Sequence, residues 1–435
     1  MKRLALIIVL LTFQFCAHAQ NWQSVGTKKF NHSVDFLYSD TTTSQLYNTG
    51  VYWMLDTINA YGMSVWNGVE WDSAFISCGA GPKRICRFQG ELYVSRNPHL
   101  LRWNGASWDT AANAVAIAGM YNDGDSVLYI MGQFNSVNSI PASKIARFDG
   151  TTWSAIDTTI WQINPVCAIR YQGDMYFGGL FYNSSNNIWR IARWDGTNWN
   201  AVGAGITGSI CGVQCMEEYN GYLYVGGYME VAQGNPGNHI ARWDGTTWTQ
   251  VGGGMFGGQV FNMQNFNGSL WAVGQFSYAG GVPASYIARY DGLDWCSVGV
   301  FDNAITGIEV HNGELYIGGN FWTADGDSVN KVVKWIGGNF ADSCGHLNTG
   351  IFEASNPTVV QFYPNPVDQS GTFKFESGET RTVVILDNLG REVWRKETDQ
   401  VSVEFSANEY ADGIYFYVVS ENGSTPISGR FIVAH

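Results

Sequence analysis

The residues best suited to chemistry in this 435-residue chain are arginines and aspartates placed two positions apart. Residues two apart on a strand lie on the same face, about 6.6 Å from each other, so each arginine could form an ion pair with its aspartate. The pair recurs along the chain, however, and we expect a feature that recurs in this way to have a structural role in the fold. The four pairs are Arg147 with Asp149, Arg193 with Asp195, Arg242 with Asp244, and Arg289 with Asp291.

Candidate metal ligands are few. The segments Asp123-Gly-Asp125 and Asp325-Gly-Asp327 could bind Ca²⁺ through their carboxylates, although neither has the loop of an EF-hand. The sequence has no CxxC pair and no HExxH motif, the spacings typical of zinc sites. We therefore expect no cofactor, with Ca²⁺ as the alternative.

Residues 1–19 have the pattern of a secretory signal peptide. Lys2 and Arg3 precede an apolar run from Leu4 to Phe15, which is too short to cross a bilayer as a helix, and Ala17-His18-Ala19 follows. The formal net charge of −13 would become −15 without the two basic residues, which argues against nucleic acid and anionic membranes as partners. No later run is apolar for long enough to form a transmembrane segment.

Seven cysteines would remain after the loss of Cys16 with the signal peptide. An odd number in an oxidising compartment leaves at least one cysteine free or paired between chains. Cys78 and Cys86, which flank a turn, are the favoured disulfide.

A tryptophan-rich repeat organises the next three quarters of the chain. The motif aromatic-Asp/Asn-Gly-x-x-Trp first occurs at Trp66 and recurs at intervals of 37 to 49 residues. Its last copy, at Trp335, is degenerate. Each period also contains an Asn-Gly or Gln-Gly turn followed by a sequence such as Leu223-Tyr-Val-Gly-Gly227. One period therefore reads as four strands, which is typical of a propeller blade. We predict an all-β fold with about seven blades over residues 20–350, while counts of six and eight stay open.

The segment from Asn21 to Gly26 matches the outer strand of the repeat without its three preceding strands. We expect it to dock on or beside the last blade and tie the ring shut. Residues 340–343 are the other candidate for the final outer strand.

The strand order predicts two different faces. The Asn-Gly and Asp-Gly turns fall on one face, and the longer loops fall on the other, where binding is usual. The candidate binding residues are those that break the repeat on the loop face. They are Trp161, Tyr182, Trp189, Glu230, His239, Tyr278, Trp322, Asp325 and Asp327.

The repeats resemble a family of extracellular propeller repeats of the form Gly-Gly-x-Phe, loop, Ile-Ala-Arg-Trp-Asp-Gly-x-x-Trp. The resemblance covers about residues 21–345 and is close at 128–155, 223–251 and 270–298. It implies a propeller similar to those of kelch and galactose-oxidase proteins, and it implies no particular activity.

After a linker at 351–360, residues 361–435 alternate like a small β-sandwich. Four ordered motifs resemble the type A C-terminal sorting domain of the type IX secretion system. They comprise Tyr363, Pro364, Asn365 and Pro366; Gly390; Gly413 and Tyr415; and Gly429 and Arg430. The resemblance implies contact with the type IX secretion machinery, transport across an outer membrane, and release or attachment to the cell surface.

The sequence therefore favours a secreted or cell-surface binding or adhesion module for a glycan or a protein. It has no nucleophile elbow, phosphate loop or paired acid motif. The alternative is a carbohydrate-active enzyme, a glycosidase or lyase, with its site in the loop face. Two carboxylates about 5–10 Å apart at the channel mouth would favour a glycosidase, and an aromatic loop face without them would favour binding.

Overall fold

The computed structural model contains two compact units, Met1–Phe340 and Ala341–His435. It describes residues 21–435 except 75–80, 157–163, 209–211, 232–233, 338–360, 364–366, 376–377, 388–390 and 422–426. The expected signal peptide therefore lies outside the described residues. Within the described ranges, no helix is long and apolar enough to span a membrane.

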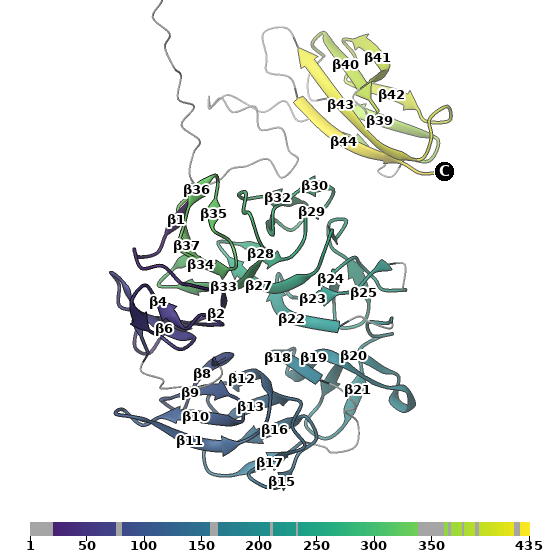
Figure 1. The fold of residues 1–435 in the computed structure, drawn as a ribbon. Coiled ribbons are helices and arrows are strands. Elements are labelled where there is room, and N and C mark those ends of the chain that lie inside the picture. The colour runs from purple at the N-terminus through teal and green to yellow at the C-terminus, as the bar shows by residue number, and fades with distance from the viewer. Residues whose placement is uncertain are drawn as a thin grey trace, which may run out of the picture. The chain divides into compact units, whose positions relative to one another are not determined.

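The described residues of the first unit form seven four-stranded antiparallel sheets and several short hairpins (Figure 1). We number the four-stranded sheets as blades in chain order, each from its inner to its outer strand. Blade 1 contains β2 (Val34–Asp40), β3 (Gln45–Gly50), β6 (Met63–Trp66) and β7 (Trp71–Ser73); blade 2 contains β8 (Arg84–Phe88), β9 (Glu91–Arg96), β10 (His99–Trp103) and β11 (Trp108–Asn113); blade 3 contains β12 (Ile117–Asp123), β13 (Val127–Gly132), β16 (Ile145–Phe148) and β17 (Trp153–Ala155).

The next four blades repeat this arrangement. Blade 4 contains β18 (Asn164–Tyr171), β19 (Asp174–Asn183), β20 (Ile188–Trp194) and β21 (Trp199–Ala201); blade 5 contains β22 (Gly212–Tyr219), β23 (Tyr222–Tyr228), β24 (Ile240–Trp243) and β25 (Trp248–Gln250); blade 6 contains β27 (Val260–Phe266), β28 (Ser269–Gly274), β31 (Ile287–Tyr290) and β32 (Trp295–Ser297); blade 7 contains β33 (Ile305–His311), β34 (Glu314–Gly319), β37 (Val332–Trp335) and β1 (Trp22–Ser24).

The seven inner strands contact one another in a closed circle (Figure 1). The order is β2, β8, β12, β18, β22, β27, β33 and back to β2. A closed ring of radial four-stranded sheets defines a β-propeller. The predicted all-β propeller fold is therefore confirmed.

The ring is closed by the N-terminal strand. β1 pairs with β37 in the register Trp22 to Trp335, and Trp22 is fully buried. Its indole Nε1 donates to the carbonyl of Val298 in the loop after blade 6, at 2.9 Å. This confirms that the Trp22 segment docks on the last blade, where it supplies the outer strand.

The tryptophans of the repeat join neighbouring blades. In blade 1, Trp71 Nε1 donates to the carbonyl of Val25 in the preceding blade at 2.9 Å, and in blade 6 Trp295 Nε1 donates to Val251 at 3.1 Å. These two rings thus fill the space between neighbouring sheets and satisfy their own donors there. The rings therefore help to hold neighbouring blades together.

The expected ion pairs inside the repeat are wrong for three of the four arginines. Arg193 Nη1 lies 3.6 Å from Asp174 Oδ2, not beside Asp195. Asp195 Oδ1 instead accepts the backbone N–H groups of Thr197 and Asn198, at 2.9 and 2.7 Å. The other two donate to their outer strands, Arg147 to Ser154 and Arg242 to Thr249. The aspartates are turn residues because their short side chains reach the backbone two and three positions on.

The favoured disulfide is also wrong. Cys86 carries a free thiol in the core, and burial raises its pKa to about 12. Cys296 is disulfide-bonded, whereas Cys167 and Cys215 are free.

Short hairpins extend the loops of several blades. The hairpin strands are β4 (Met54–Leu55) and β5 (Ile58–Asn59), β14 (Ser136–Val137) and β15 (Ile140–Pro141), β29 (Tyr278–Ala279) and β30 (Val282–Pro283), and β35 (Thr323–Ala324) and β36 (Asp327–Ser328). Two further elements are β26 (Met255–Phe256), which joins the β29–β30 hairpin, and the 3-10 helix η1 (Ser184–Asn186).

The second unit has two antiparallel sheets with a shared core. One contains β38 (Gln361–Tyr363), β39 (Ser370–Lys374) and β42 (Ser402–Ser406), and the other contains β40 (Arg381–Leu386), β41 (Glu392–Thr398), β43 (Gly413–Glu421) and β44 (Ile427–Val433). Phe373 and Phe405 from the first sheet pack with Phe431 from the second. The expected β-sandwich is confirmed.

Candidate functional site

The strand order places two kinds of connection on opposite faces of the propeller. Strands alternate in direction within a blade, so the loop between its second and third strands lies at the same end as the loop to the next blade. We call this end the loop face. The two tight turns of each blade lie at the other end, the turn face.

Exposed large apolar side chains concentrate on the loop face. Among the described residues of the propeller, ten of these thirteen side chains lie there: Val51, Trp53, Val115, Ile140, Leu180, Val231, Phe256, Tyr278, Val300 and Trp322. The turn face has Val69, Leu293 and Ile336. Exposed apolar side chains that gather into a contiguous patch mark a site of interaction with another molecule.

The loop face is braced between blades. β26, in the loop after blade 5, pairs with the hairpin of blade 6, so that exposed Phe256 lies directly opposite exposed Tyr278. An isolated bridge joins Phe301 to Ala324 in the same way between blades 6 and 7. These pairings connect the loops of neighbouring blades through their backbones.

Trp322, a candidate from the sequence, is 49% exposed and rests on a buried cation. Lys331 Nζ lies 3.2 Å from the centre of the indole ring and donates to the carbonyl of Asn320 at 2.8 Å. Burial lowers the pKa of Lys331 to about 8. A cation against one face of the ring leaves the other face for a ligand.

Tyr182 and Trp189 are brought together by the strand extensions of blade 4. They face each other across β19 and β20, and their rings stack at 5.6 Å with an angle of 10°. Arg190 lies 5.9 Å from the Tyr182 ring. The main contact of the Tyr182 ring is thus the Trp189 ring. Trp161 lies outside the described residues.

Glu230 and His239 meet at Tyr228 in blade 5. The Tyr228 hydroxyl donates to Glu230 Oε1 at 3.0 Å, and its ring lies 5.3 Å from the imidazole. His239 is buried, which lowers its pKa, and Nδ1 accepts the backbone N–H of Met229. Its positive φ recurs at Lys331, just before the third strand of blade 7. His239 therefore occupies a position of the scaffold.

Asp325 joins the N-terminal strand to blade 7. Its Oδ1 accepts the backbone N–H of Val300 at 2.9 Å, and its Oδ2 accepts that of Asn21 at 3.1 Å. Asp327 is exposed two residues later. Asp123, in the other Asp-Gly-Asp segment, forms an ion pair with Arg170. In the described part of the chain, no three His, Cys, Asp or Glu side chains gather as metal ligands.

Two carboxylates on inner strands were missed in the sequence. Burial raises the pKa of Glu217 to about 7 and that of Glu309 to about 8. Glu217 Oε1 accepts the backbone N–H of Asn265 on the next blade at 3.0 Å, and Glu309 accepts that of Ser39. The sequence does contain a sign of them, because both glutamates occupy the same position of the repeat. Glu217 lies two residues before Tyr219 of the Tyr-Asn-Gly turn, and Glu309 lies two residues before His311 of the His-Asn-Gly turn.

The same position carries other acceptors in other blades. The hydroxyl of Tyr38 accepts the N–H of Arg87, and that of Tyr121 accepts the N–H of Arg170. Joining inner strands is therefore a sufficient role for the two glutamates.

The sorting motifs lie in the second unit. Tyr415 and the Gly429-Arg430 pair come from the adjacent strands β43 and β44, where Tyr415 pairs with Phe431. Tyr363 ends β38 and is exposed. Pro364, Asn365, Pro366 and Gly390 lie outside the described residues.

Comparison with known families identifies this second unit. Residues 361–434 match the family of secretion system C-terminal sorting domains. The chain therefore carries a sorting domain of the type IX secretion system, which marks it for export and for release or attachment at the cell surface. No curated protein matches the chain.

Several solved structures cover more than 90% of the chain. The extracellular domain of a hybrid two-component system from B. thetaiotaomicron has a TM-score of 0.51 and 11% identity, covering 96% of this chain and 59% of its own. At this identity the likeness concerns the fold alone.

Two other structures have lower scores. PorZ, an essential surface component of the type IX secretion system of Porphyromonas gingivalis, has a TM-score of 0.44 and 13% identity, covering 92% of this chain and 59% of its own. The propeller domain of the Trilobed protease from Pyrococcus furiosus has a TM-score of 0.43 and 10% identity, covering 70% and 96%. The chain thus spans about three fifths of the first structures it matches.

Proposed function

We propose that this protein is a non-enzymatic adhesion module that binds a protein partner through the loop face of its propeller. The observation that carries the proposal is the concentration of exposed apolar side chains on that face. Valine, leucine and isoleucine side chains accompany the aromatic ones, and this mixture suits the core of a protein interface. A glycan would use aromatic rings together with polar groups and would gain little from the valines.

A glycan ligand is the second candidate, because Trp322 presents a single supported ring to solvent. A glycosidase is less well supported. Glu217 and Glu309, whose pKa values are raised, both accept backbone N–H groups of the next blade. A role in joining blades accounts for them without a substrate.

Replacing both Tyr278 and Trp322 by alanine is expected to weaken binding at least about tenfold, because exposed aromatic side chains dominate such interfaces. The secreted full-length chain would be tested for adhesion to immobilised extracellular-matrix proteins and to whole cells. A double variant of the turn face, Val69→Ser with Leu293→Ser, is the matched control and should bind as the wild type does.

Treating the immobilised target with protease or periodate distinguishes a protein ligand from a glycan ligand. Protease should abolish adhesion, whereas periodate oxidation of glycans should leave it unchanged. Loss of adhesion after periodate alone would favour the glycan, and release of reducing sugar from polysaccharide would favour the enzyme. Equal adhesion by both double variants would remove the loop face from consideration.

Deletion of residues 361–435 is expected to stop export, because this segment carries the sorting domain. The truncated chain should accumulate inside the outer membrane, as measured by cell fractionation and immunoblotting. The control is Phe416→Ser, an exposed substitution in β43. Surface display of the truncated chain would contradict the prediction.

A further inference from the structure

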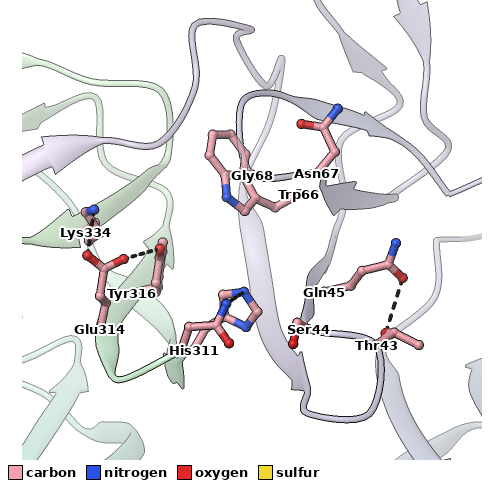
Figure 2. A pocket seen from close by; sticks show the side chains of 11 residues that line it. Thr43, Ser44, Gln45, Trp66, Asn67, Gly68, His311, Glu314, Tyr316 and Lys334 are labelled. Atoms are coloured by element: carbon pink, nitrogen blue, oxygen red, sulfur yellow. Dashed lines mark hydrogen bonds and ion pairs between the residues drawn. The ribbon is translucent and has the colours of Figure 1, made fainter.

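The contact between blades 7 and 1 contains a cavity of about 510 Å³ at the turn face (Figure 2). Trp66 and Gln45 line it from blade 1, and His311, Glu314, Tyr316 and Lys334 line it from blade 7. A smaller hollow of about 210 Å³ shares Trp66, Tyr316 and Lys334 and extends toward β1. We call the two together the seam cleft. Its main cavity is of the size that small-molecule sites have, about 300–1,000 Å³.

The cleft exists because the repeat changes at this contact. In blades 2 and 5 an aromatic residue before the tight turn meets the first aromatic residue of the Asp-Gly turn in the next blade, whereas blades 1 and 3 have Asp40 and Asp123 at that position, each paired with an arginine of the next blade. Phe88 meets Phe148 at 5.9 Å, and Tyr219 meets Tyr290 at 6.5 Å. The equivalent residue in blade 7 is His311, which is shorter than tyrosine.

The imidazole of His311 is fixed by two hydrogen bonds, one on each ring nitrogen. Nδ1 lies 3.0 Å from Ser39 Oγ, and Nε2 lies 3.1 Å from Asn312 Nδ2. Burial lowers the pKa of His311, so the ring is neutral at neutral pH. The space that two packed rings occupy where blades 2 and 5 meet the next blade is therefore open here.

The polar groups of the cleft form a pre-arranged set. Glu314 Oε1 accepts from Lys334 Nζ and Oε2 accepts from the Tyr316 hydroxyl, both at 2.8 Å. Partial burial opposes ionisation of Glu314, but the hydrogen bonds from Lys334 and Tyr316 outweigh it and lower the pKa. The carboxylate and the ammonium neutralise each other, and His311 adds no charge. A phosphate or carboxylate ligand would find no unpaired cation among these groups.

We propose that the seam cleft binds a neutral saccharide ring. Trp66 supplies an aromatic wall, and the side chains of Gln45, Glu314 and Lys334 supply acceptors and donors for hydroxyl groups. Aromatic stacking combined with a few placed polar groups suits an uncharged, polyhydroxylated ring. This site lies on the face opposite the proposed protein-binding surface and does not depend on it.

The decisive variant is His311→Tyr, which restores the ring present at this position in blades 4 and 5. It is expected to fill the cleft, to fold as the wild type does, and to reduce saccharide binding at least about tenfold. Glu314→Gln, which removes the negative charge beside Lys334 at little change in volume, is a second variant and should also weaken binding. Val69→Ser, an exposed substitution near Trp66, is the matched control and should bind normally.

Binding would be measured on the full-length secreted chain by saturation-transfer NMR and by tryptophan fluorescence. The probes are the methyl glycosides of glucose, galactose, mannose and N-acetylglucosamine, with sialic acid and inorganic phosphate as charged comparisons. Thermal melts would show that each variant is folded. The expected result is saturable binding of at least one neutral glycoside, lost in both cleft variants.

The proposal is overturned if no neutral glycoside binds at 10 mM, roughly the weak limit of specific recognition. It is also overturned if the charged probes bind more tightly, or if folded His311→Tyr and Glu314→Gln bind as the wild type does. Loss of adhesion in the loop-face variant with saccharide binding retained would show that the two proposals stand or fall separately.

Discussion

Replacing Trp22 by alanine is expected to lower the free energy of unfolding of the propeller by about 3–5 kcal/mol. The side chain is fully buried, and its ring lies 4.9 Å from that of Trp335 and 5.5 Å from that of Phe301. Alanine would leave a cavity and an unpaired carbonyl at Val298. The loss falls where the two ends of the propeller meet, so closure of the ring itself should weaken.

The measurement is unfolding of the secreted chain in guanidinium chloride, followed by tryptophan fluorescence. Trp53→Ala is the control, because Trp53 is 66% exposed and should contribute little to stability. Trp295→Ala removes the same interaction inside the ring and should cost a similar amount. An unchanged midpoint for Trp22→Ala would mean that β1 does not close the propeller.

Replacing Glu309 by glutamine is expected to stabilise the protein by about 4–5 kcal/mol at pH 9. Burial raises the pKa of Glu309 to about 8, from an ordinary value of 4.5. Between these two pH values the folded chain holds a proton that the unfolded chain has released, so stability falls as pH rises and levels off above pH 8. Glutamine never loses charge neutrality, and its amide oxygen can still accept the N–H of Ser39.

Blade 6 already contains this solution, since Gln264 occupies the position of Glu309 there. The measurement is the denaturation midpoint of both chains from pH 4 to pH 9. The two should coincide near pH 4 and diverge as pH rises. Glu218→Gln, on the exposed side of β22, is the control and should follow the wild type. Parallel curves for Glu309→Gln and the wild type would contradict the prediction.

Much of the fold could be predicted because its signals are local. The Asn220-Gly221 turn has positive φ at both residues, as its sequence indicates. The arginine pairs were wrong because spacing shows which residues share a face, whereas a neighbouring strand can offer a nearer partner. Arg193 reaches Asp174, nineteen positions earlier in the chain, across the sheet.

The candidate site was predicted only in part. Tyr278 and Trp322 are exposed on the loop face, as their loops suggested, but His239 and Asp325 are engaged by the scaffold. Loop membership alone could not separate these two groups. Whether a polar side chain is free for a ligand depends on the backbone groups that surround it.

The sequence by itself determined the repeat, the strands of each blade, the turn chemistry and the sorting domain, because neighbours along the chain specify these features. Only the tertiary structure decided which residues meet between blades. Trp22 donates a hydrogen bond to Val298, and Glu309 accepts one from Ser39. His311 and Trp66 line the seam cleft from its two blades. These partners lie more than 240 positions apart, so closing the ring is the step that brings them together.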